Sequence, residues 1–513
     1  MTHAGGRRLP RLPPWALAAG LAAAYLLLDP RSADLAAQEY RSGLFARAGF
    51  TLWDNGWYAG HHGPAYSLLF PPLGAWLGPQ VVGALAAVAG TWAFGRLAGR
   101  ETRLAGAWCV LAMTTLLVTG RLTFALGVAL GLAALAAARD GRWAGALALA
   151  ALTSAASPVA GAFVALAVAA WWIGEPGARR APTLAFGVAS VAPAGLVALL
   201  FPEGGTFPFA LSSFLPALAA TLLVLVIVPE EQRVLRAGVA LSAVLLVVSW
   251  ALPTPMGGNA VRLGALFAGP ALAIVLLPAG RARTLALVAP ALVYWQLAAP
   301  VDNWRRTAHD PSVQKRAYAG LERFLAEKSS PPATPFRVEV PFTDNHWEAQ
   351  NLAGGAHGFP LARGWERQLD RRVNALFYDG EPLTAGRYRA WLDANAVRFV
   401  ALPDAPIDYS AAAEAQLLRD GLPYLSRVYA DRVWTVWEVL DATPIGVSAL
   451  TPDGFTTARA GKVRIRWSPW FQVIGGRGCV RRTADDRVAT DGALTVRARL
   501  SVGGALRREE HCR

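Results

Sequence analysis

Charged residues are scarce in this sequence: they make up 16% of 513 residues, whereas an average soluble domain carries about 25%. The shortage is uneven, because the chain before about Ala299 is rich in Ala, Leu, Val and Gly, and charges become dense from Asp302 onward. This uneven distribution of charge is explained if the two parts of the chain lie in two different solvents. We therefore expect the first part in a lipid bilayer and the second in water.

Signatures of several common function classes are also absent. The sequence has no glycine-rich phosphate loop, no serine-nucleophile elbow and no paired-cysteine zinc pattern. The net charge of +14 is not accompanied by a basic and aromatic binding module. Most basic residues of the first half instead lie in short loops between apolar runs, so we expect no nucleic-acid partner.

Cysteine is nearly absent, with three residues in the whole chain. Cys109 lies inside an apolar run, which predicts a small buried thiol. Cys479 and Cys512 both lie in the charged part, where a disulfide would close a loop of about 33 residues and contribute roughly 3–4 kcal/mol. Cys512 is one residue from the end, so the sequence leaves this pairing open.

What the first half does contain is a series of apolar runs of about spanning length. Eleven can be read, near residues 12–29, 79–96, 104–120, 122–138, 143–156, 158–174, 182–201, 210–228, 235–251, 262–278 and 283–299. The first has a basic start, but no small-x-small cleavage site follows it, so we interpret it as a span and not as a signal peptide. The prediction is a polytopic helical membrane domain over residues 1–300.

Arginine positions predict the orientation of this domain. Alternate loops carry pairs or triplets of arginine, and the loops between them have almost none. The basic loops contain Arg7, Arg8 and Arg11; Arg96, Arg100 and Arg103; Arg139 and Arg142; Arg179 and Arg180; Arg233 and Arg236; and Arg281 and Arg283. By the positive-inside rule the N-terminus is cytoplasmic, and an odd number of spans places the chain after Ala299 outside. The high Ala, Arg and Gly content is typical of a GC-rich bacterial genome, which makes the location a bacterial plasma membrane.

The exported half reads as two units. Residues 301–442 alternate helical and strand patterns, as in "TAGRYRAWLDANAVRFVAL" (384–402), which predicts an α/β or α+β domain. Asp310 and Pro311 are expected to begin a helix as N-cap and first helical residue. Residues 443–513 contain "KVRIRWSPWFQVIG" and "GALTVRARLSVGG", which alternate like strands and predict a small all-β module.

Residues 30–78 form the one long loop between predicted spans. Asp34 follows the first span closely, Glu39 is five residues further on, and the stretch around them has the spacing of a helix that could lie on the bilayer surface. Next comes "WDNGWYAGHHGPAYS", which contains several candidate substrate-binding residues: Asp54, Trp57, Tyr58, His61 and His62. Adjacent histidines diverge, which argues against one shared metal ion. Phosphate or acceptor binding, hydrogen bonding within a folded loop, and an aromatic belt at headgroup level all stay open. If one carboxylate of this loop acts as a catalytic base, Asp54 is an alternative to Asp34.

Two arginines depart from the alternation and are candidate phosphate ligands. Arg262, in "MGGNAVRLGALF", lies at the outer end of a predicted span, where a guanidinium can grip a phosphate in bidentate fashion. Asn259 and the glycines before it permit close backbone approach. Arg121 is a similar candidate, and for both the alternative is an arginine reaching toward lipid headgroups.

The exported half has one concentrated polar and aromatic patch, between about Val340 and Asn374. Its histidines, tryptophans and arginines could line a carbohydrate-binding surface. The spacing of Arg363, Arg367 and Arg371, with Glu366 and Asp370 between them, favours instead a salt-bridged helix face.

The whole layout resembles the GT-C class of membrane glycosyltransferases: one span, an acid at the head of a large outside loop, many further spans and an exported C-terminal part. The resemblance covers roughly residues 1–300. It implies a sugar donor linked to polyprenyl phosphate, reaction at the outer membrane face and Asp34 as catalytic base. The acidic doublet common in that class is missing, because Leu35 and Ala36 follow Asp34.

We therefore predict a glycosyltransferase that transfers a sugar from a polyprenyl-phosphate carrier to a cell-envelope glycan, lipid or protein. Asp34 and Glu39 are the catalytic candidates, and no cofactor is assigned, with a divalent metal ion left open. A non-catalytic scaffold for envelope assembly and a transporter or flippase are the alternatives. Transporters usually show repeats and ionisable residues within their spans, and this sequence has almost none of either.

Overall fold

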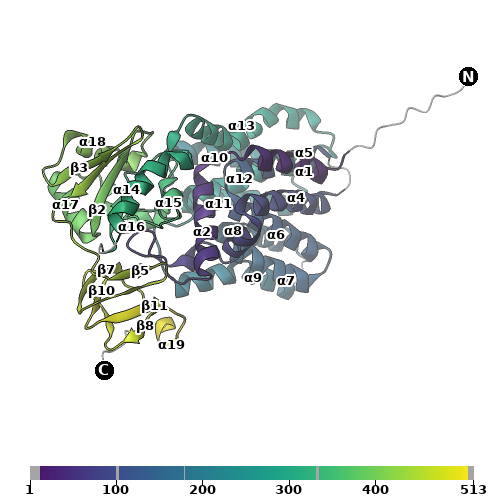
Figure 1. The fold of residues 1–513 in the computed structure, drawn as a ribbon. Coiled ribbons are helices and arrows are strands. Elements are labelled where there is room, and N and C mark those ends of the chain that lie inside the picture. The colour runs from purple at the N-terminus through teal and green to yellow at the C-terminus, as the bar shows by residue number, and fades with distance from the viewer. Residues whose placement is uncertain (1–11, 100–102, 178–179, 331–333, 507–513) are drawn as a thin grey trace, which may run out of the picture.

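The computed structural model describes residues 12–99, 103–177, 180–330 and 334–506. The chain is helical over its first 330 residues or so and contains β-sheets after that. Figure 1 shows the two parts side by side, with the helical bundle in purple to teal and the later part in green to yellow.

A helix occupies each of the eleven predicted apolar runs. They are α1 (Pro14–Leu28), α4 (Pro79–Ala98), α5 (Arg103–Val118), α6 (Leu122–Arg139), α7 (Trp143–Ala156), α8 (Pro158–Gly174), α9 (Arg180–Leu200), α10 (Leu211–Ile227), α11 (Arg233–Ala251), α12 (Val261–Leu276) and α13 (Ala282–Thr307). Two further helices, α2 (Ala33–Ala48) and α3 (Phe70–Leu77), lie between α1 and α4.

Six of the helices in the described residues are long and apolar enough to cross a membrane by length and composition: α4, α6, α9, α11, α12 with the turn before it, and α13. Five apolar helices are shorter, with 10–17 residues. A helix of 15 residues is only about 22 Å long, less than the thickness of the hydrocarbon core of a bilayer. The predicted count of eleven spans is therefore not confirmed.

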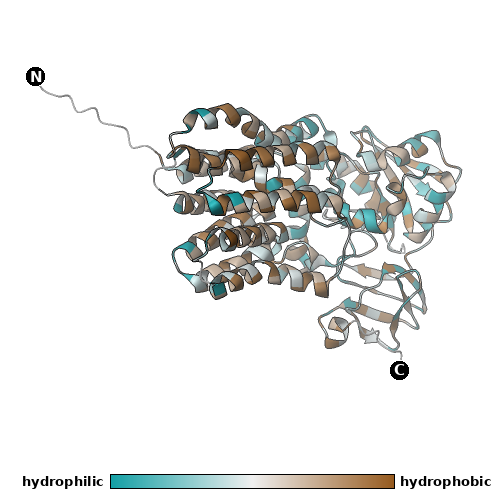
Figure 2. Cartoon of the chain, turned by 180° about the vertical axis from the view of Figure 1, so that it is seen from behind, coloured by the Kyte–Doolittle hydropathy of each residue, from teal (hydrophilic) through white to brown (hydrophobic). Residues whose placement is uncertain are grey.

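The outside of the bundle is apolar, as expected for a surface that faces lipid. Large apolar side chains point outward from several helices, including Leu27, Leu199, Val226 and Leu287, each more than two-thirds exposed. Figure 2 shows the brown hydrophobic colour along the bundle helices, with more teal in the C-terminal part. A water-soluble surface would not carry so many exposed apolar side chains together.

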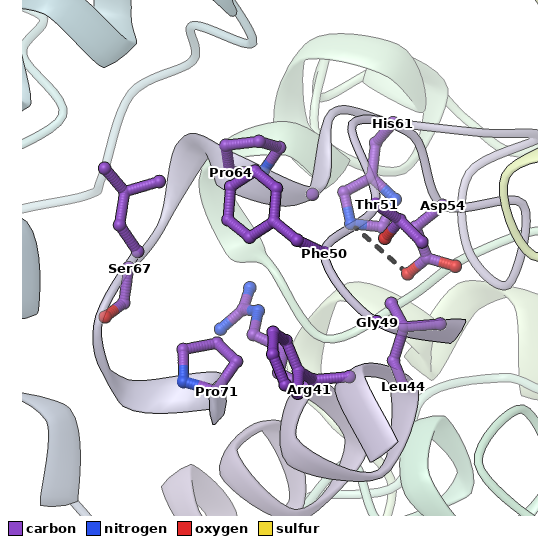
Figure 3. Close-up of a pocket in the computed structure, with 13 residues that line it drawn as sticks. Arg41, Leu44, Gly49, Phe50, Thr51, Asp54, His61, Pro64, Ser67 and Pro71 are labelled. Carbon is purple, nitrogen blue, oxygen red and sulfur yellow. Dashed lines mark ion pairs between the residues drawn. The ribbon is translucent and has the colours of Figure 1, made fainter. Parts of the chain in front are cut away.

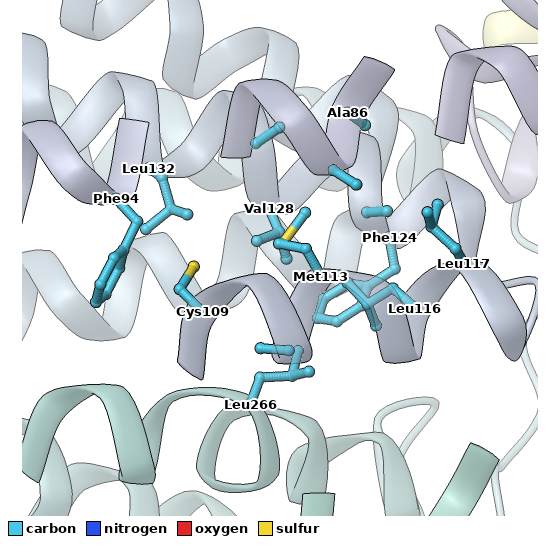
Figure 4. Close-up of a cluster of buried hydrophobic side chains, with 14 of the residues drawn as sticks. Ala86, Phe94, Cys109, Met113, Leu116, Leu117, Phe124, Val128, Leu132 and Leu266 are labelled. Carbon is cyan, nitrogen blue, oxygen red and sulfur yellow. The ribbon is translucent and has the colours of Figure 1, made fainter. Parts of the chain in front are cut away.

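Inside the bundle, α4, α5, α6 and α12 pack around one apolar core. Met113, Phe124 and Leu132 are among its buried side chains, and Leu266 of α12 closes it from another side (Figure 4). Cys109 lies fully buried in this core, as the sequence predicts. This core fixes the ends of α5, α6 and α12, which matters for the site described below.

The C-terminal part has three sheets. The first has the order β1-β2-β4-β3, with β1 parallel to β2 and the other pairs antiparallel; its strands are β1 (Arg337–Glu339), β2 (Val397–Pro403), β3 (Leu425–Ala430) and β4 (Trp434–Val439). Helices α14 (Ala319–Ser329), α15 (Glu348–Asn351), α16 (Arg367–Val373), α17 (Ala385–Ala394) and α18 (Ala412–Asp420) belong to the same region. The predicted helix-to-strand step at 384–402 is confirmed by α17 and β2.

The other two sheets form the end of the chain. One has the order β7-β10-β9 and the other β5-β6-β11-β8. The strands are β5 (Ala449–Thr451), β6 (Gly454–Thr456), β7 (Gly461–Arg466), β8 (Phe471–Gly476), β9 (Val480–Arg482), β10 (Arg487–Thr490) and β11 (Leu494–Ala498), followed by the short α19 (Val502–Ala505). Cys512 lies outside the described residues, so its pairing with Cys479 stays a prediction.

The α2 helix forms as predicted, and half of its residues, Leu35 and Tyr40 among them, are buried between the bundle and the C-terminal part. Its position along a bilayer surface stays a prediction. One local prediction needs correction. Asp310 does cap a helical turn by accepting a hydrogen bond from the Ser312 amide at 2.8 Å, but that turn is a short 3-10 helix and the α-helix begins only at Ala319.

Candidate functional site

Asp34 lies in the first turn of α2 and is held by an arginine of the bundle. Arg121 donates from Nε to its Oδ2 at 3.1 Å, and about a quarter of each side chain is exposed. Gly120 makes this approach possible: its φ is +68°, and a Cβ there would lie 2.2 Å from the Ser32 hydroxyl. The turn between α5 and α6 can therefore pass directly beside the start of α2.

Arg262 lies in the first turn of α12, next to a 3-10 turn that contains Asn259. Its guanidinium lies over the Phe124 ring, 5.3 Å from the centroid. Within the described chain it has no carboxylate within ion-pair distance, whereas Arg121 has Asp34. Arg121 is also near enough to repel it electrostatically, so two cations share one carboxylate here.

These residues meet at a cavity of about 520 Å³ between the two halves of the molecule. Asp34, Asn259 and Arg262 line it, and Arg121 lies behind Asp34. The rest of the wall comes from the bundle and from the C-terminal part, which contributes Asp344, His346, Trp365, Glu366, Arg367, Gln368 and Asp408. The cavity therefore brings together candidate residues of the bundle and of the C-terminal part. Their separations in sequence run from about 80 residues (Arg262 to Asp344) to about 370 (Asp34 to Asp408).

The C-terminal wall is rich in ion pairs. Arg367 binds Asp408 at 2.7 Å, Arg306 binds Asp344 at 3.2 Å, and Glu366 pairs with Arg41 of α2. Burial would raise the pKa of Asp408, but the hydrogen bond from Arg367 and the nearby His346 outweigh it and hold the pKa well below its usual range. Burial raises the pKa of Asp344, and Arg306 only partly opposes it.

The predicted salt-bridged helix over Arg363, Arg367 and Arg371 is wrong. Helix α16 begins at Arg367, and Arg363 lies before it, fully buried and bound to Asp370 at 2.7 Å. Before α16, Trp57 packs against the backbone of Gly364, where a Cβ would lie 2.5 Å from that ring. Arg367, in the first turn of α16, lines the cavity.

Residues 53–62 form a closed joint, and none of the five candidates in it lines the cavity, whereas Ala65 and Tyr66, just after the joint, do. Asp54 is buried, accepts hydrogen bonds from the Tyr40 hydroxyl at 2.9 Å and from the Gly56 amide at 2.8 Å, and lies 3.7 Å from His61 Nε2. Figure 3 shows Asp54 and His61 together at a pocket of only about 40 Å³. That space is about enough for water and too small for a sugar.

His62 belongs to a second closed cluster. Its Nδ1 lies 2.7 Å from Glu203, and its Nε2 lies 3.1 Å from the hydroxyl of Ser468 in the β-rich module. Arg372 and Arg466 also bind Glu203, at 2.9 and 3.3 Å. Burial raises the pKa of Glu203, but Arg466 and His62 more than cancel that effect and keep the pKa well below normal.

The aromatic residues of the joint dock the C-terminal part. The Trp57 indole donates to the Ala349 carbonyl at 3.3 Å, and the Tyr58 hydroxyl donates to the Glu366 carbonyl at 2.9 Å. Asn55 binds the β-rich module through the carbonyl oxygens of Thr451 and Gly454, both at 2.9 Å. Trp57 and Tyr58 are fully buried, so they do not form a headgroup belt.

Glu39 lies away from the cavity. It is bound by Arg31 at 3.2 Å and by the Gln80 amide at 3.1 Å, and burial raises its pKa. Five residues along a helix turn the side chain by about 140°, so Asp34 and Glu39 point to different sides of α2. The structure thus separates the two predicted catalytic residues.

Sequence reasoning missed Asp408, Gln368 and Arg306 as wall residues. Asp408 lies in an unremarkable loop, "PDAPIDYS", and no local pattern marks it. The polar patch around Arg367 did carry a signal, but the favoured interpretation of it was structural.

No group of three or more metal-ligating side chains occurs in the described residues that could hold a metal ion. A divalent ion would therefore need ligands from a substrate, such as phosphate oxygens. No protein-family model matches the chain, and no curated protein matches it significantly. The function must be argued from the geometry of the cavity.

Proposed function

We propose that the protein is a membrane glycosyltransferase that moves a sugar from a polyprenyl-phosphate carrier to a cell-envelope acceptor. The observation that carries this proposal is the convergence of Asp34, Asn259 and Arg262 on one cavity. A base and a phosphate ligand must flank one sugar, and holding both reactants in a single cavity lowers the entropic part of the barrier.

Each step has a residue in place. The acceptor hydroxyl loses its proton to Asp34, whose Oδ1 has no hydrogen-bond partner among the described residues. The acceptor oxygen bonds to the anomeric carbon of the sugar while the bond from that carbon to the phosphate oxygen breaks. The leaving polyprenyl phosphate is anionic, and Arg262, which has no carboxylate partner among the described residues, stabilises it.

The carrier lipid also has a place to bind. An apolar groove of about 440 Å³ lies within the bundle and is lined by α8, α10, α11, α12 and Trp295 of α13. Leu263, Gly264 and Phe267 of α12 line it, directly after Arg262 in the sequence. A phosphate at Arg262 would therefore leave its polyprenyl chain at the opening of an apolar surface of matching chemistry.

The proposed orientation places the cavity outside a bacterial plasma membrane. Contacts between loops support it, because loops assigned to the cytoplasm touch each other: Arg96 binds Asp140 at 2.8 Å, and Arg281 donates to the Ile227 carbonyl at 3.2 Å. The C-terminal part lies at the other end of the bundle (Figure 1), and it supplies part of the cavity wall. In this arrangement all spans, including the five shorter helices, cross or enter the bilayer.

The test is the consumption of labelled polyprenyl-phosphate sugars, both hexose and pentose, by the purified full-length protein. Asp34→Asn should lower the rate by about 10²- to 10⁴-fold. Glu39→Gln, on the same helix but away from the cavity, should stay within about threefold of the unmodified protein. Equal rates for Asp34→Asn and the unmodified protein would remove the base from the mechanism.

A non-catalytic scaffold is the second candidate. The ion pair between Asp34 and Arg121 and the dense contacts of residues 53–67 with both C-terminal units favour it. A scaffold would show no consumption of any polyprenyl-phosphate sugar, and Asp34→Asn would leave its envelope phenotype unchanged.

A further inference from the structure

The two sides of the cavity differ in charge balance. On the bundle side, Arg121 and Arg262 face one carboxylate, that of Asp34, which leaves one positive charge without a carboxylate partner in the part of the chain that the structure describes. This side suits a phosphate. The question is what the C-terminal side suits, since an acceptor must enter there if the carrier occupies the bundle side.

Each carboxylate on the C-terminal side has a cationic partner. Asp408 faces Arg367, Glu366 faces Arg41, and Asp344 faces Arg306, which also binds the exposed Asp302 at 2.9 Å. An anionic acceptor would find no unpaired cation on this side in the described structure, and a cationic acceptor would find no unpaired carboxylate. Burying a charged group there would cost desolvation free energy without an opposite charge to offset it.

Hydrogen-bonding capacity nevertheless remains. The Gln368 side chain lines the cavity half-buried, and its amide has no hydrogen-bond partner among the described residues. The Asn259 amide, across the cavity, is likewise without a partner in that part of the chain. An amide offers both donors and an acceptor, and so do the hydroxyl groups of a sugar.

Trp365 adds an apolar ring to this wall. Its indole N–H is already used, because it donates to the Ala33 carbonyl at 2.9 Å. The ring, half-buried and lining the cavity, thus contributes surface without an unsatisfied donor. A ring beside neutral amides matches a molecule with apolar C–H faces and a rim of hydroxyl groups.

We propose that the C-terminal wall formed by Trp365, Gln368 and the paired charges around them is a subsite for a neutral carbohydrate, and that the acceptor is therefore a glycan. This inference rests on the proposed transferase function, which left glycan, lipid and protein acceptors open. A lipid acceptor would need a second apolar groove at this wall, and an extended peptide would need free backbone groups at a strand edge.

The experiment is saturation-transfer NMR on the full-length protein in detergent. The probes are a set of neutral oligosaccharides of hexoses and pentoses, the corresponding uronic acids, a serine- and threonine-rich peptide, and undecaprenyl phosphate. Neutral oligosaccharides should give saturation-transfer signals. In Gln368→Leu the affinity obtained from these signals should be about 3- to 10-fold lower, since one neutral hydrogen-bonding group is lost. Gln416→Leu, an exposed glutamine on α18, is the matched control and should change nothing.

Each outcome decides something. Binding of the peptide or the uronic acids in place of neutral oligosaccharides would overturn the proposal, as would sugar signals that Gln368→Leu leaves unchanged. Failure of undecaprenyl phosphate to bind, with oligosaccharide binding intact, would instead overturn the transferase function and leave the carbohydrate subsite standing. Arg262→Gln should weaken only the undecaprenyl phosphate signal.

Discussion

Asp34 and Asp54 come from the same 50-residue stretch between α1 and α4, and their surroundings differ completely. Asp54 is 2% exposed, is bound by the Tyr40 hydroxyl and the Gly56 amide, and borders a pocket that holds little more than water. Asp34 is bound by one arginine, keeps a free oxygen and faces a cavity of about 520 Å³. A polar residue whose hydrogen bonds are complete holds the fold together, whereas one with capacity left at a cavity can act on a ligand.

The largest expected effect tests the closed side of this comparison. Glu203→Gln leaves Arg372, Arg466 and His62 around a neutral amide, and breaking a buried charge cluster of this kind should cost about 3 kcal/mol of stability. The Asp34 side chain is 25% exposed, against 5% for Glu203, so Asp34→Asn should cost under about 1 kcal/mol. Thermal unfolding of the two variants measures both, and similar losses would erase the distinction between joint and cavity.

The next effect tests the open side. Arg262→Gln should weaken binding of undecaprenyl phosphate by about 10- to 100-fold, because it removes charged hydrogen bonds to the phosphate. Arg372→Gln removes a cation that already belongs to Glu203 and should leave that affinity within a factor of about two. Titration of the lipid into detergent-solubilised protein distinguishes them. An equal loss in both variants would mean that overall charge, and not the cavity, attracts the phosphate.

Much of the helical scaffold could be predicted, because each apolar run is continuous and needs no partner to be recognised. The same holds for the step from α17 to β2, where helical spacing changes to alternation within a few residues. Arg121 and Arg262 could be identified for a related reason. Both lie at the ends of spans where the alternation of basic loops predicts no arginine, so each stands out in the sequence.

The contents of residues 53–67 could not be predicted in this way. Histidines, tryptophans and an aspartate look the same in sequence whether their hydrogen bonds go to a substrate or to another part of the chain. Their partners here, such as Ser468 and Thr451, are about 400 residues away. Likewise, the helix begins only at Arg367, and just before it Trp57 packs against Gly364, a tertiary contact that the helical spacing does not reveal.

A smaller effect follows from the pKa of Glu203, which the fold holds well below its unfolded value. A carboxylate with a depressed pKa stabilises the folded state fully above the unfolded pKa, near 4.3, and that stabilisation is lost as the pH falls. At pH values below about 4.5 the free energy of unfolding should therefore fall by up to about 1 kcal/mol per pH unit, and the unfolding temperature should fall with it. Glu203→Gln should reduce this slope, and Asp34→Asn should leave it unchanged. An unchanged slope in Glu203→Gln would show that other carboxylates cause the acid sensitivity.

The smallest effect lies where the two regions meet. Trp365 lines the cavity, and its indole N–H holds the Ala33 carbonyl, one residue before Asp34. Trp365→Phe removes that hydrogen bond and keeps most of the ring, so it should cost about 0.5–1.5 kcal/mol. If the C-terminal wall positions α2, the consumption of polyprenyl-phosphate sugar should fall by about 3- to 10-fold, more than the loss of stability alone would cause at a temperature where the protein stays folded.

Trp304→Phe, at an exposed site on α13, is the control for the substitution itself. A loss of stability with an unchanged rate would mean that Trp365 stabilises the fold, as the closed joint does, without positioning Asp34 for the reaction.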